Sequence, residues 1–408
     1  MRGYGRKRGN TFALEVSLGM APAQRCETCN KRIWIERKPL DLCPACGGKL
    51  HETEERRRHT KCYPTEAERD EALNKIMASV QEHRFVAPAR LTTRAYFLKE
   101  WLPAIKATVR PTTYASYQTL CEQHIVAELG SVQLQRLNGA RINAFYAKLL
   151  EDGRVHGKGG LSPASVRRVH ACLHRALKDA VRWDRLAVNP VDAADPPHER
   201  SERRRLPAWN SEQLSAFLDS VKGERLFALW RLMAMTGCRR GEALGLRWES
   251  VNMAAGTITI RQALVPVQRR VVVSEPKTAR GRRTLALDPT TLEVLKDHAA
   301  RQADERASAG EAWAESGYVF VQPDGQHLHP ERVSALFRRQ VKAACLPTIP
   351  LHGLRHTYAT LALSAGVNPR IVSARLGHST VALTLDIYSH VMPQDDQAAA
   401  DRIAALIA

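Results

Sequence analysis

Thr236-Gly-Cys-Arg-Arg-Gly-Glu242 and Leu351-His-Gly-Leu-Arg-His356 are two short stretches, set far apart in this chain of 408 residues, that each supply an arginine. A guanidinium group binds two phosphate oxygens in a fork, and a nearby carboxylate such as Glu242 holds that fork in place. His352 and Arg355 lie three residues apart, so they project from one side at the start of a predicted helix, whose N-terminal dipole favours an anion. The two stretches therefore predict the halves of one cationic pocket for a phosphate.

A third stretch, Leu385-Asp-Ile-Tyr-Ser-His390, supplies a tyrosine to attack that phosphate. A phenol with a pKa of about 10 needs help to lose its proton. Two guanidinium groups and a histidine around the phosphate provide that stabilisation. Arginines, histidines and a late tyrosine together indicate a way of cutting DNA without a metal.

With these motifs the chain strongly resembles the tyrosine recombinases, also called the phage integrase family. The TGxRxxE and HxLRH patterns of that family are intact, and Pro276-Lys-Thr278 resembles its β-hairpin lysine. The resemblance implies a role for each matching residue. Arg239 and Arg355 bind the phosphate, Glu242 supports Arg239, His352 transfers a proton, Lys277 protonates the leaving 5′ oxygen, His378 donates to the scissile phosphate, and Tyr388, ten residues after His378, is the nucleophile.

Each of these residues also has an ordinary interpretation when it is read alone. An arginine and a glutamate on one helical turn usually form a surface salt bridge, and a lone histidine is usually a polar residue with satisfied hydrogen bonds. Lys277 lies close to three arginines, as an exposed turn lysine would. Tyr358 and His356 are interpreted as structural, with His356 pointing elsewhere on its helix. The order of five motifs over residues 236–390 is what makes the signature specific.

The charge of the chain points to a polyanionic partner. Its 61 basic and 42 acidic side chains give a net charge of +19, and phosphate contacts with counterion release favour such an excess. A merely soluble basic protein, or a ribosomal-type binder, would share this charge. No run of residues approaches the length of a membrane span, and the basic N-terminus is not followed by the apolar segment of a signal peptide.

The expected fold class is multidomain and mainly α with small β elements. The first unit, with predicted strands at residues 12–18 and 32–35 and a helix after Pro64, resembles an arm-site DNA-binding domain of the α+β type. The predicted parts are this N-terminal zinc-ribbon/arm-type domain at residues 1–86, a helical core-binding (SAM-like) domain at 91–194, a linker at 195–205, a tyrosine-recombinase catalytic domain at 206–394, and a C-terminal tail for protomer exchange at 395–408.

A helix of the second domain carries a basic stripe. Ser162-Pro163 predicts its start, since serine is a good N-cap and proline suits the first helical position. Apolar residues at helical spacing define one face, and a basic face lies elsewhere on the same helix. The DNA-binding candidates on that face are Arg168, Arg175, Lys178 and Arg182. A solvated surface explains such a stripe equally well.

Two cysteine pairs, Cys26-Glu-Thr-Cys29 and Cys43-Pro-Ala-Cys46, predict a metal site near the N-terminus. Each CxxC turn places two thiolates together, and two such turns close a tetrahedral site around one structural zinc. Two unrelated pairs or a redox dithiol are the alternatives. Paired thiolates also fit a reducing cytoplasm. A zinc ribbon is not a regular part of phage integrases, so here the chain departs from the family.

The resemblance implies a site-specific recombinase, an integrase of a phage or integrative mobile element. It would cut and rejoin double-stranded DNA attachment sites through a 3′-phosphotyrosyl link, with no ATP and no catalytic metal. It further implies a homotetramer on DNA, with a directionality factor and a DNA-bending protein as candidate partners and no membrane. Two alternatives remain: a type IB topoisomerase-like enzyme, and a non-catalytic zinc-ribbon DNA-binding regulator.

Overall fold

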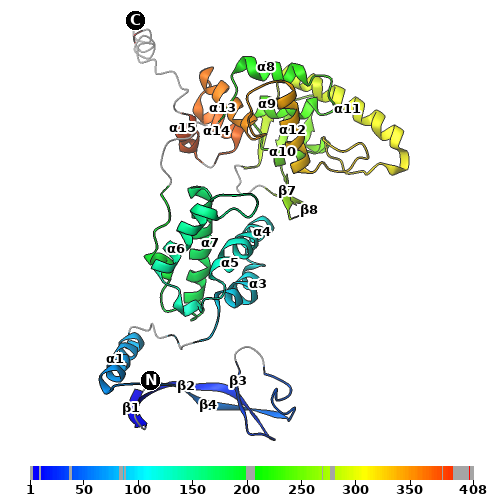
Figure 1. The fold of residues 1–408 in the computed structure, drawn as a ribbon. Coiled ribbons are helices and arrows are strands. Elements are labelled where there is room, and N and C mark those ends of the chain that lie inside the picture. The colour runs from blue at the N-terminus through cyan, green and yellow to red at the C-terminus, as the bar shows by residue number, and fades with distance from the viewer. Residues whose placement is uncertain are drawn as a thin grey trace. The chain divides into compact units, whose positions relative to one another are not determined.

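The computed structural model describes residues 3–8, 11–35, 39–81, 86, 89–198, 207–268, 270–275, 281–378, 380–388 and 404 (Figure 1). The chain divides into two compact units, Met1–Arg200 and Ser201–Ala408, and each is described by itself. The described elements are mainly helices, together with small antiparallel sheets. None of the described helices has the length and the apolar composition that a membrane span requires.

The N-terminal part is built around one long strand. β2 (Thr11–Cys26) pairs antiparallel with β4 (Leu50–Tyr63) along its length, with β1 (Gly3–Arg8) at its start and with β3 (Arg32–Trp34) at its end. The helix α1 (Glu66–Gln81) packs against β1, β2 and β4. The strand expected at residues 12–18 lies within β2, the one expected at 32–35 matches β3 except for its last residue, and β1 was not predicted.

The second part of the first unit is helical. Its elements are α2 (Thr93–Ala95), η1 (Tyr96–Trp101), α3 (Leu102–Ile105), α4 (Pro111–Leu120), η2 (Cys121–Ile125), α5 (Val126–Leu129), η3 (Leu134–Arg136), α6 (Gly139–Asp152), α7 (Pro163–Arg182) and η4 (Pro190–Ala193). Ser162 caps α7 by accepting a hydrogen bond from the backbone N–H of Ser165. Tyr96, Phe97 and Trp101 are fully buried in the core that these helices share.

The second unit holds the three sequence motifs. Its helices are α8 (Ser211–Ser220), α9 (Phe227–Thr236), α10 (Arg240–Leu244), η5 (Trp248–Ser250), α11 (Pro289–Ala309), η7 (Gly310–Ala312), α12 (Pro330–Ala343), α13 (Gly353–Ser364), α14 (Pro369–Leu376) and α15 (Val381–Tyr388). One sheet contains β5 (Val251–Asn252), β6 (Thr257–Ile260) and β9 (Arg283–Ala286), and a second contains β7 (Ala263–Val267) and β8 (Arg270–Ser274).

The core of this unit fixes the helices that carry the motifs. Trp209, Phe217, Trp230 and Phe337 pack ring against ring, with neighbouring centroids 5.2–5.9 Å apart. Such aromatic pairs contribute about 0.5–1.5 kcal/mol each beyond the burial of their area. α9 packs against α10, α11 and α13, while α13, α14 and α15 pack against one another (Figure 1). The ends of these helices are therefore held in fixed positions relative to one another.

Candidate active site

A glycine turn joins the end of α9 to the first motif. Gly237 has a left-handed backbone with φ of 62°, which favours glycine because a side chain is strained there. A Cβ atom at this position would also lie only 2.6 Å from the ring of Tyr358 and 2.7 Å from Leu376. The turn therefore approaches α13 and α14 closely, and it delivers Arg239 to the start of α10.

Glu242 holds Arg239 from two directions. The Arg239 guanidinium donates through Nη1 to Glu242 at 2.8 Å, and the Arg239 backbone N–H donates to the other carboxylate oxygen at 2.9 Å. Its Nη2 also donates to the carbonyl of Gly377 at 3.3 Å. The Arg239 side chain remains 42% exposed, while that of Glu242 is only 7% exposed. One edge of the guanidinium is fixed and another stays open to an incoming anion.

A second arginine, Arg283 at the start of β9, binds the same carboxylate. It donates to the two oxygens of Glu242 at 2.8 and 3.3 Å. Burial raises the pKa of Glu242, but hydrogen bonds and charge from Arg283 and Arg239 lower it more, so the net pKa is below its ordinary value. Glu242 is thus ionised near neutral pH between two cations.

The second motif brings Arg355 to the same turn. Arg355 lies on the first turn of α13, is 2% exposed, and donates through Nη1 to the carbonyl of Gly237 at 2.9 Å. His352 immediately precedes this helix. Burial first, and then the charges of His356, Arg355 and Arg239, lower the pKa of His352, although the residue keeps an exposed face. A neutral imidazole in this place can accept a proton.

His356 differs from its sequence-based interpretation. Its ring packs perpendicular to that of His352, with the centroids 5.0 Å apart. Residues four apart share a helix face, so His356 supports His352 instead of pointing elsewhere. Tyr358 agrees better with a structural role, because its hydroxyl accepts a hydrogen bond of 2.6 Å from Arg375.

His378 joins the pocket from the end of α14. Gly377 ends that helix in a left-handed conformation, and His378 is 8% exposed. Its Nδ1 lies 2.8 Å from the hydroxyl of Thr384, which is fully buried on α15. Tyr388 is the last residue of α15, one turn after Thr384, and its side chain lies outside the described part of the structure. His378 is thereby tied to the helix that carries the predicted nucleophile.

The pKa of His378 leads to a prediction about stability. Burial, followed by the charges of Arg355, Arg239, His356 and Arg283, lowers this pKa to about 4. Between pH 6.5 and 4 the unfolded chain binds a proton that the folded chain excludes, so stability falls as the pH falls. In His378→Asn, the free energy of unfolding should fall by about 2–3 kcal/mol less than in the parent over this pH range. Urea titrations at pH 7 and pH 4.5 measure the free energy of unfolding of both proteins. An equal decrease in the variant and the parent would contradict the lowered pKa of His378.

Lys277 lies outside the described residues, in the segment 276–280 that joins β8 to β9. Residues 395–408, expected to form a tail, are also outside them except for Ala404. Both expectations therefore stay predictions. The linker expected at residues 195–205 is described only as far as residue 198.

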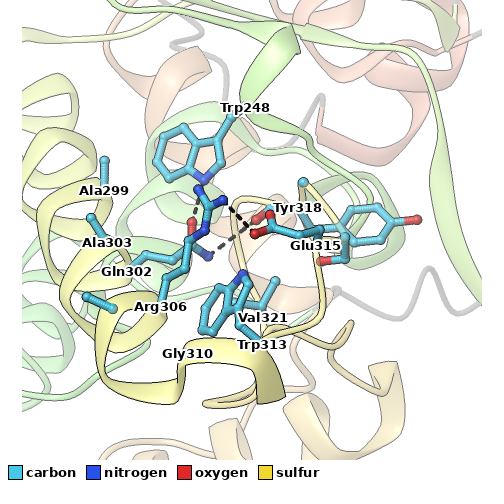
Figure 2. Close-up of a pocket in the computed structure, with 13 residues that line it drawn as sticks. Trp248, Ala299, Gln302, Ala303, Arg306, Gly310, Trp313, Glu315, Tyr318 and Val321 are labelled. Atoms are coloured by element: carbon cyan, nitrogen blue, oxygen red, sulfur yellow. Dashed lines mark hydrogen bonds and ion pairs between the residues drawn. The ribbon is translucent and has the colours of Figure 1, made fainter.

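A large cavity lies away from these residues. It measures about 770 Å³ and is lined by α11 alanines together with Trp248, Trp313 and Tyr318 (Figure 2). At its rim Arg306 and Glu315 form an ion pair of 2.6 Å. Neither Arg239 nor Arg355 lines this cavity. The candidate site is accordingly an arrangement of cations around the Gly237 turn, which suits a phosphate in a polymer better than an enclosed small molecule.

Two family models match the chain. Residues 204–395 match the phage integrase family, and residues 93–150 match the phage integrase N-terminal SAM-like domain. The chain belongs to the phage integrase family. This family member is thus a tyrosine recombinase, as the order of its motifs predicted. The matches cover the expected catalytic domain and part of the expected core-binding domain, and neither of them reaches the four paired cysteines.

Relatives of this integrase family member have similar lengths. A tyrosine recombinase XerC-like protein of Caldanaerobacter subterraneus subsp. tengcongensis is 26% identical over 348 residues, which cover 81% of this chain and 86% of the relative. The ICEBs1 integrase of Bacillus subtilis is 24% identical over 353 residues, which cover 84% and 92%.

Solved structures share the fold. The Tn1549 transposon integrase, in complex with a circular intermediate DNA, matches with a TM-score of 0.62 and 20% identity over 77% of this chain and 99% of that chain. A lambda integrase dimer bound to a COC′ core site matches with a TM-score of 0.55 and 13% identity over 95% and 94%.

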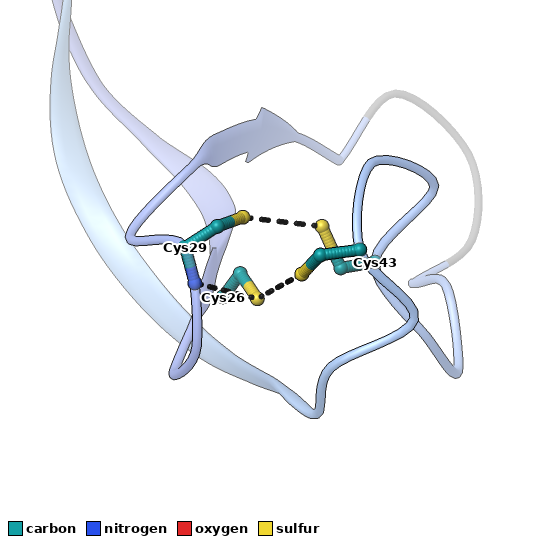
Figure 3. Close-up of side chains that lie close together, drawn as sticks. Cys26, Cys29 and Cys43 are labelled. Atoms are coloured by element: carbon teal, nitrogen blue, oxygen red, sulfur yellow. Dashed lines mark hydrogen bonds between the residues drawn. The ribbon is translucent and has the colours of Figure 1, made fainter.

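The paired cysteines of this integrase family member form one cluster (Figure 3). Their four sulfur atoms lie within 4.8 Å of one another, with Cys26 and Cys46 3.4 Å apart and Cys29 and Cys43 3.7 Å apart. Cys26 ends β2, and the cluster therefore lies at the end of the β2–β4 pair. A tetrahedral zinc with four thiolates at about 2.3 Å requires sulfur separations of about 3.8 Å, which this cluster approaches.

The basic stripe on α7 lies on the exposed side of that helix. Arg168, Arg175, Lys178 and Arg182 are all exposed, whereas Val169, Leu173 and Leu177 face the core. Arg175 donates to the hydroxyl of Tyr117 at 3.2 Å, and Arg182 pairs with Asp179 at 2.9 Å. The stripe therefore presents donors to solvent, two of which already have partners.

Sequence reasoning missed two residues of the site. Arg283 was noted only as a cation near Lys277, and Thr384 was not singled out. The position of Thr384, four residues before Tyr388, places it on the same face of α15 and offered a weak signal. Nothing in the sequence indicated that Arg283 reaches Glu242, because 41 residues separate the two.

Proposed function

We propose that this tyrosine recombinase is the integrase of a phage or integrative mobile element and acts on double-stranded DNA attachment sites. The observation that carries the proposal is the convergence of Arg239 and Arg355 on the Gly237 turn, beside His352 and His378. Both guanidinium groups are held by hydrogen bonds within the protein, at 2.8 Å to Glu242 and 2.9 Å to Gly237. Such preorganised donors stabilise charge that develops on a phosphate in a transition state.

The proposed reaction transfers one phosphoester bond at a time. The Tyr388 oxygen attacks phosphorus, the bond to the 5′ oxygen breaks, and a 3′-phosphotyrosyl link forms. Neutral His352 accepts the phenol proton, and Lys277 donates a proton to the leaving 5′ oxygen. The 5′ hydroxyl of a partner strand then reverses these steps. Because one ester replaces another, the exchange needs neither ATP nor a catalytic metal.

The assembly follows from the need to exchange strands. Two sites cut on both strands require four tyrosines, hence a homotetramer on DNA with the 395–408 tail docking on a neighbouring protomer. A directionality factor and a DNA-bending protein are the proposed accessory partners, and the exposed α7 stripe is the proposed contact of the core-binding domain with the duplex. We place this activity in the cytoplasm, where DNA and reduced thiols occur together.

The experiment that tests this function separates it from the two alternatives. The protein is incubated with a nicked suicide duplex cut from the element's ends, with two such sites on one plasmid, and with a supercoiled plasmid that lacks them. A recombinase forms covalent complexes and exchanges strands between sites. Relaxation of the plasmid without sites would favour a type IB topoisomerase-like enzyme. Binding without any covalent complex would favour a DNA-binding regulator.

Lys277 is predicted to act as the general acid. Lys277→Ala should slow cleavage of ordinary DNA by about 10²-fold or more, as loss of a general acid does. A substrate with sulfur at the 5′ bridging position should restore most of the rate, because a thiolate leaves without a proton. Single-turnover cleavage of both substrates measures the effect. Equal defects on the two would assign Lys277 another role.

The cysteine cluster is proposed to hold one structural zinc. Cys26, Cys29, Cys43 and Cys46 supply four thiolates, so no coordination position is left for water and the ion's role is folding. The site lies at one end of the β2–β4 pair, and exposed cations such as Arg6 and Lys61 lie on the same sheet. We infer that the metal fixes this sheet for binding DNA outside the crossover site.

Replacing Cys43 and Cys46 by serine should release the zinc and weaken binding to long attachment-site DNA. Cleavage of an isolated core site should persist, because every catalytic candidate lies beyond residue 238. Metal content by mass spectrometry and DNA affinity by gel shift give the two readouts. Cys62→Ser is the matched control, since this exposed cysteine lies on β4 outside the cluster. Full affinity for long attachment-site DNA after loss of the metal would contradict a DNA-binding role for the zinc ribbon and favour a role in binding protein.

A further inference from the structure

We propose that Arg283 is a positioning residue for strand cleavage: it holds Glu242 and balances its charge, so that Arg239 stays oriented and its positive charge is available to the phosphate. The inference rests on the proposed function. It adds a residue to the six catalytic candidates, which are Arg239, Lys277, His352, Arg355, His378 and Tyr388. Each guanidinium nitrogen of Arg283 already donates to an oxygen of the protein, on Glu242, Gly281 or Arg375, so we do not assign it a contact with DNA. Any effect it has on the phosphate must pass through its neighbours.

The contacts of Arg283 define what it holds. Its guanidinium grips both oxygens of Glu242, at 2.8 and 3.3 Å, in the forked geometry that fixes a carboxylate in orientation as well as in place. Glu242 uses those same two oxygens to accept from Arg239, at 2.8 Å from the side chain and 2.9 Å from the backbone. Arg239 is therefore oriented by a carboxylate that Arg283 orients.

The charges of the three groups matter as much as their geometry. A lone Glu242–Arg239 pair has no net charge, and its attraction for a phosphate would be weak. With Arg283 included, one carboxylate is shared by two guanidinium groups and the cluster carries a net charge of one. Because Glu242 and Arg283 are buried, this balance is little screened by water. Arg283 thus leaves the positive charge of Arg239 available at its exposed edge.

Arg283 also ties this cluster to the end of α14, which lies just before His378 in the chain. Its Nε donates to the carbonyl of Arg375 at 2.6 Å. In return, Arg375 donates to the carbonyl of Ala286 on β9 at 3.1 Å. The carbonyl of Gly377, the residue that follows α14, accepts a hydrogen bond from Arg239. Two hydrogen bonds therefore join β9 to the end of α14, and a third joins Arg239 to the residue that follows this helix.

The neighbouring Arg282 offers a matched control. It is also ion-paired, with Glu275 at 3.0 Å, but its side chain is 60% exposed. Among the side chains that the structure describes, it makes no hydrogen bond or ion pair with a catalytic candidate. Exposed pairs of that kind contribute little, because water and salt screen them. Arg282→Met removes the same type of side chain one position away, and it should leave cleavage nearly unchanged.

The test compares two DNA substrates in each protein preparation. One suicide duplex has an ordinary scissile phosphate, and the other has a methylphosphonate, in which a methyl group replaces one non-bridging oxygen and removes the negative charge. Arg283→Met should slow cleavage of the phosphate by about 10²-fold, the scale for losing one transition-state donor. The defect should be at least about tenfold smaller on the methylphosphonate, because a neutral centre depends less on a cation. Arg283→Lys, which keeps the charge but not the fork, should lie between parent and Met variant.

The ratio of the two rates is the decisive quantity, since any loss of folded protein lowers both rates equally and cancels. Arg239→Ala should show the same shift in ratio, which identifies the route through which Arg283 acts. An unchanged ratio in Arg283→Met, or cleavage of the phosphate at the parent's rate, overturns the inference while the proposed function stands. A parent protein that cleaves neither substrate would instead overturn the proposed function.

Discussion

Tyr388→Phe should abolish covalent attachment to DNA while leaving DNA affinity within about threefold of the parent, because only the hydroxyl is removed. The phenol oxygen is the atom that forms the new bond to phosphorus, so no residual covalent product is expected. α15, which ends at Tyr388, packs against α13 and α14. Removing one oxygen at the end of this helix should not disturb that packing. A nicked suicide duplex and a gel shift measure attachment and affinity.

The matched control for this variant is Tyr358→Phe. It removes the same oxygen from a tyrosine on α13, whose hydroxyl accepts from Arg375 at 2.6 Å. This variant should lose some stability, about 1 kcal/mol for one hydrogen bond, and should still attach to DNA. Attachment by Tyr388→Phe combined with its loss in Tyr358→Phe would reverse the assignment of the nucleophile.

Arg355→Ala should lower the rate of strand cleavage by about 10²–10³-fold, the usual effect of removing one oxyanion donor. Arg355 is 2% exposed, and its guanidinium is anchored on the Gly237 carbonyl, so it is preorganised for the phosphate before DNA binds. Arg355→Lys keeps the charge but loses the planar fork, and it should recover only part of this rate. Single-turnover cleavage gives the rates, and thermal unfolding shows whether the variants remain folded.

Arg370→Ala, at an exposed position of α14, is the control for charge alone. It removes one positive charge from the same unit without touching the Gly237 turn. Its cleavage rate should stay within about threefold of the parent, since exposed charges are screened. If Arg370→Ala and Arg355→Ala were equally defective, general attraction of DNA would explain the loss and the phosphate pocket would not.

Local signals in the sequence predicted many element boundaries. Ser162 and Pro163 start α7 as their capping preferences require, and β6 spans the β-branched run Thr257–Ile260. β7 was missed because Pro266 interrupts its pattern, and proline is accepted mainly in edge strands. β1 was missed because Gly3–Arg8 is rich in glycine and cations, and only its pairing with β2 makes it a strand.

The residues of the candidate site were also predictable only where a local motif indicated them. Arg239, His352 and Arg355 could be found because their motifs place each one beside a local partner. The carboxylate fork from Arg283 and the hydrogen bond between His378 and Thr384 join elements through the fold, at distances of 2.8 Å that spacing along the chain does not indicate. Contacts of this kind arise from tertiary packing, so they become visible only in the structure.

The most direct measurement of the central claim is to identify the atom that joins protein to DNA. The parent protein is trapped on a nicked suicide duplex, digested with trypsin and nuclease, and the nucleotide-bearing peptide is sequenced by mass spectrometry. The account predicts a single modified peptide in which Tyr388 carries a 3′-phosphonucleotide, with a free hydroxyl on the 5′ end of the released strand. A link to Tyr358, to a serine or cysteine, or through a 5′ phosphate would contradict it.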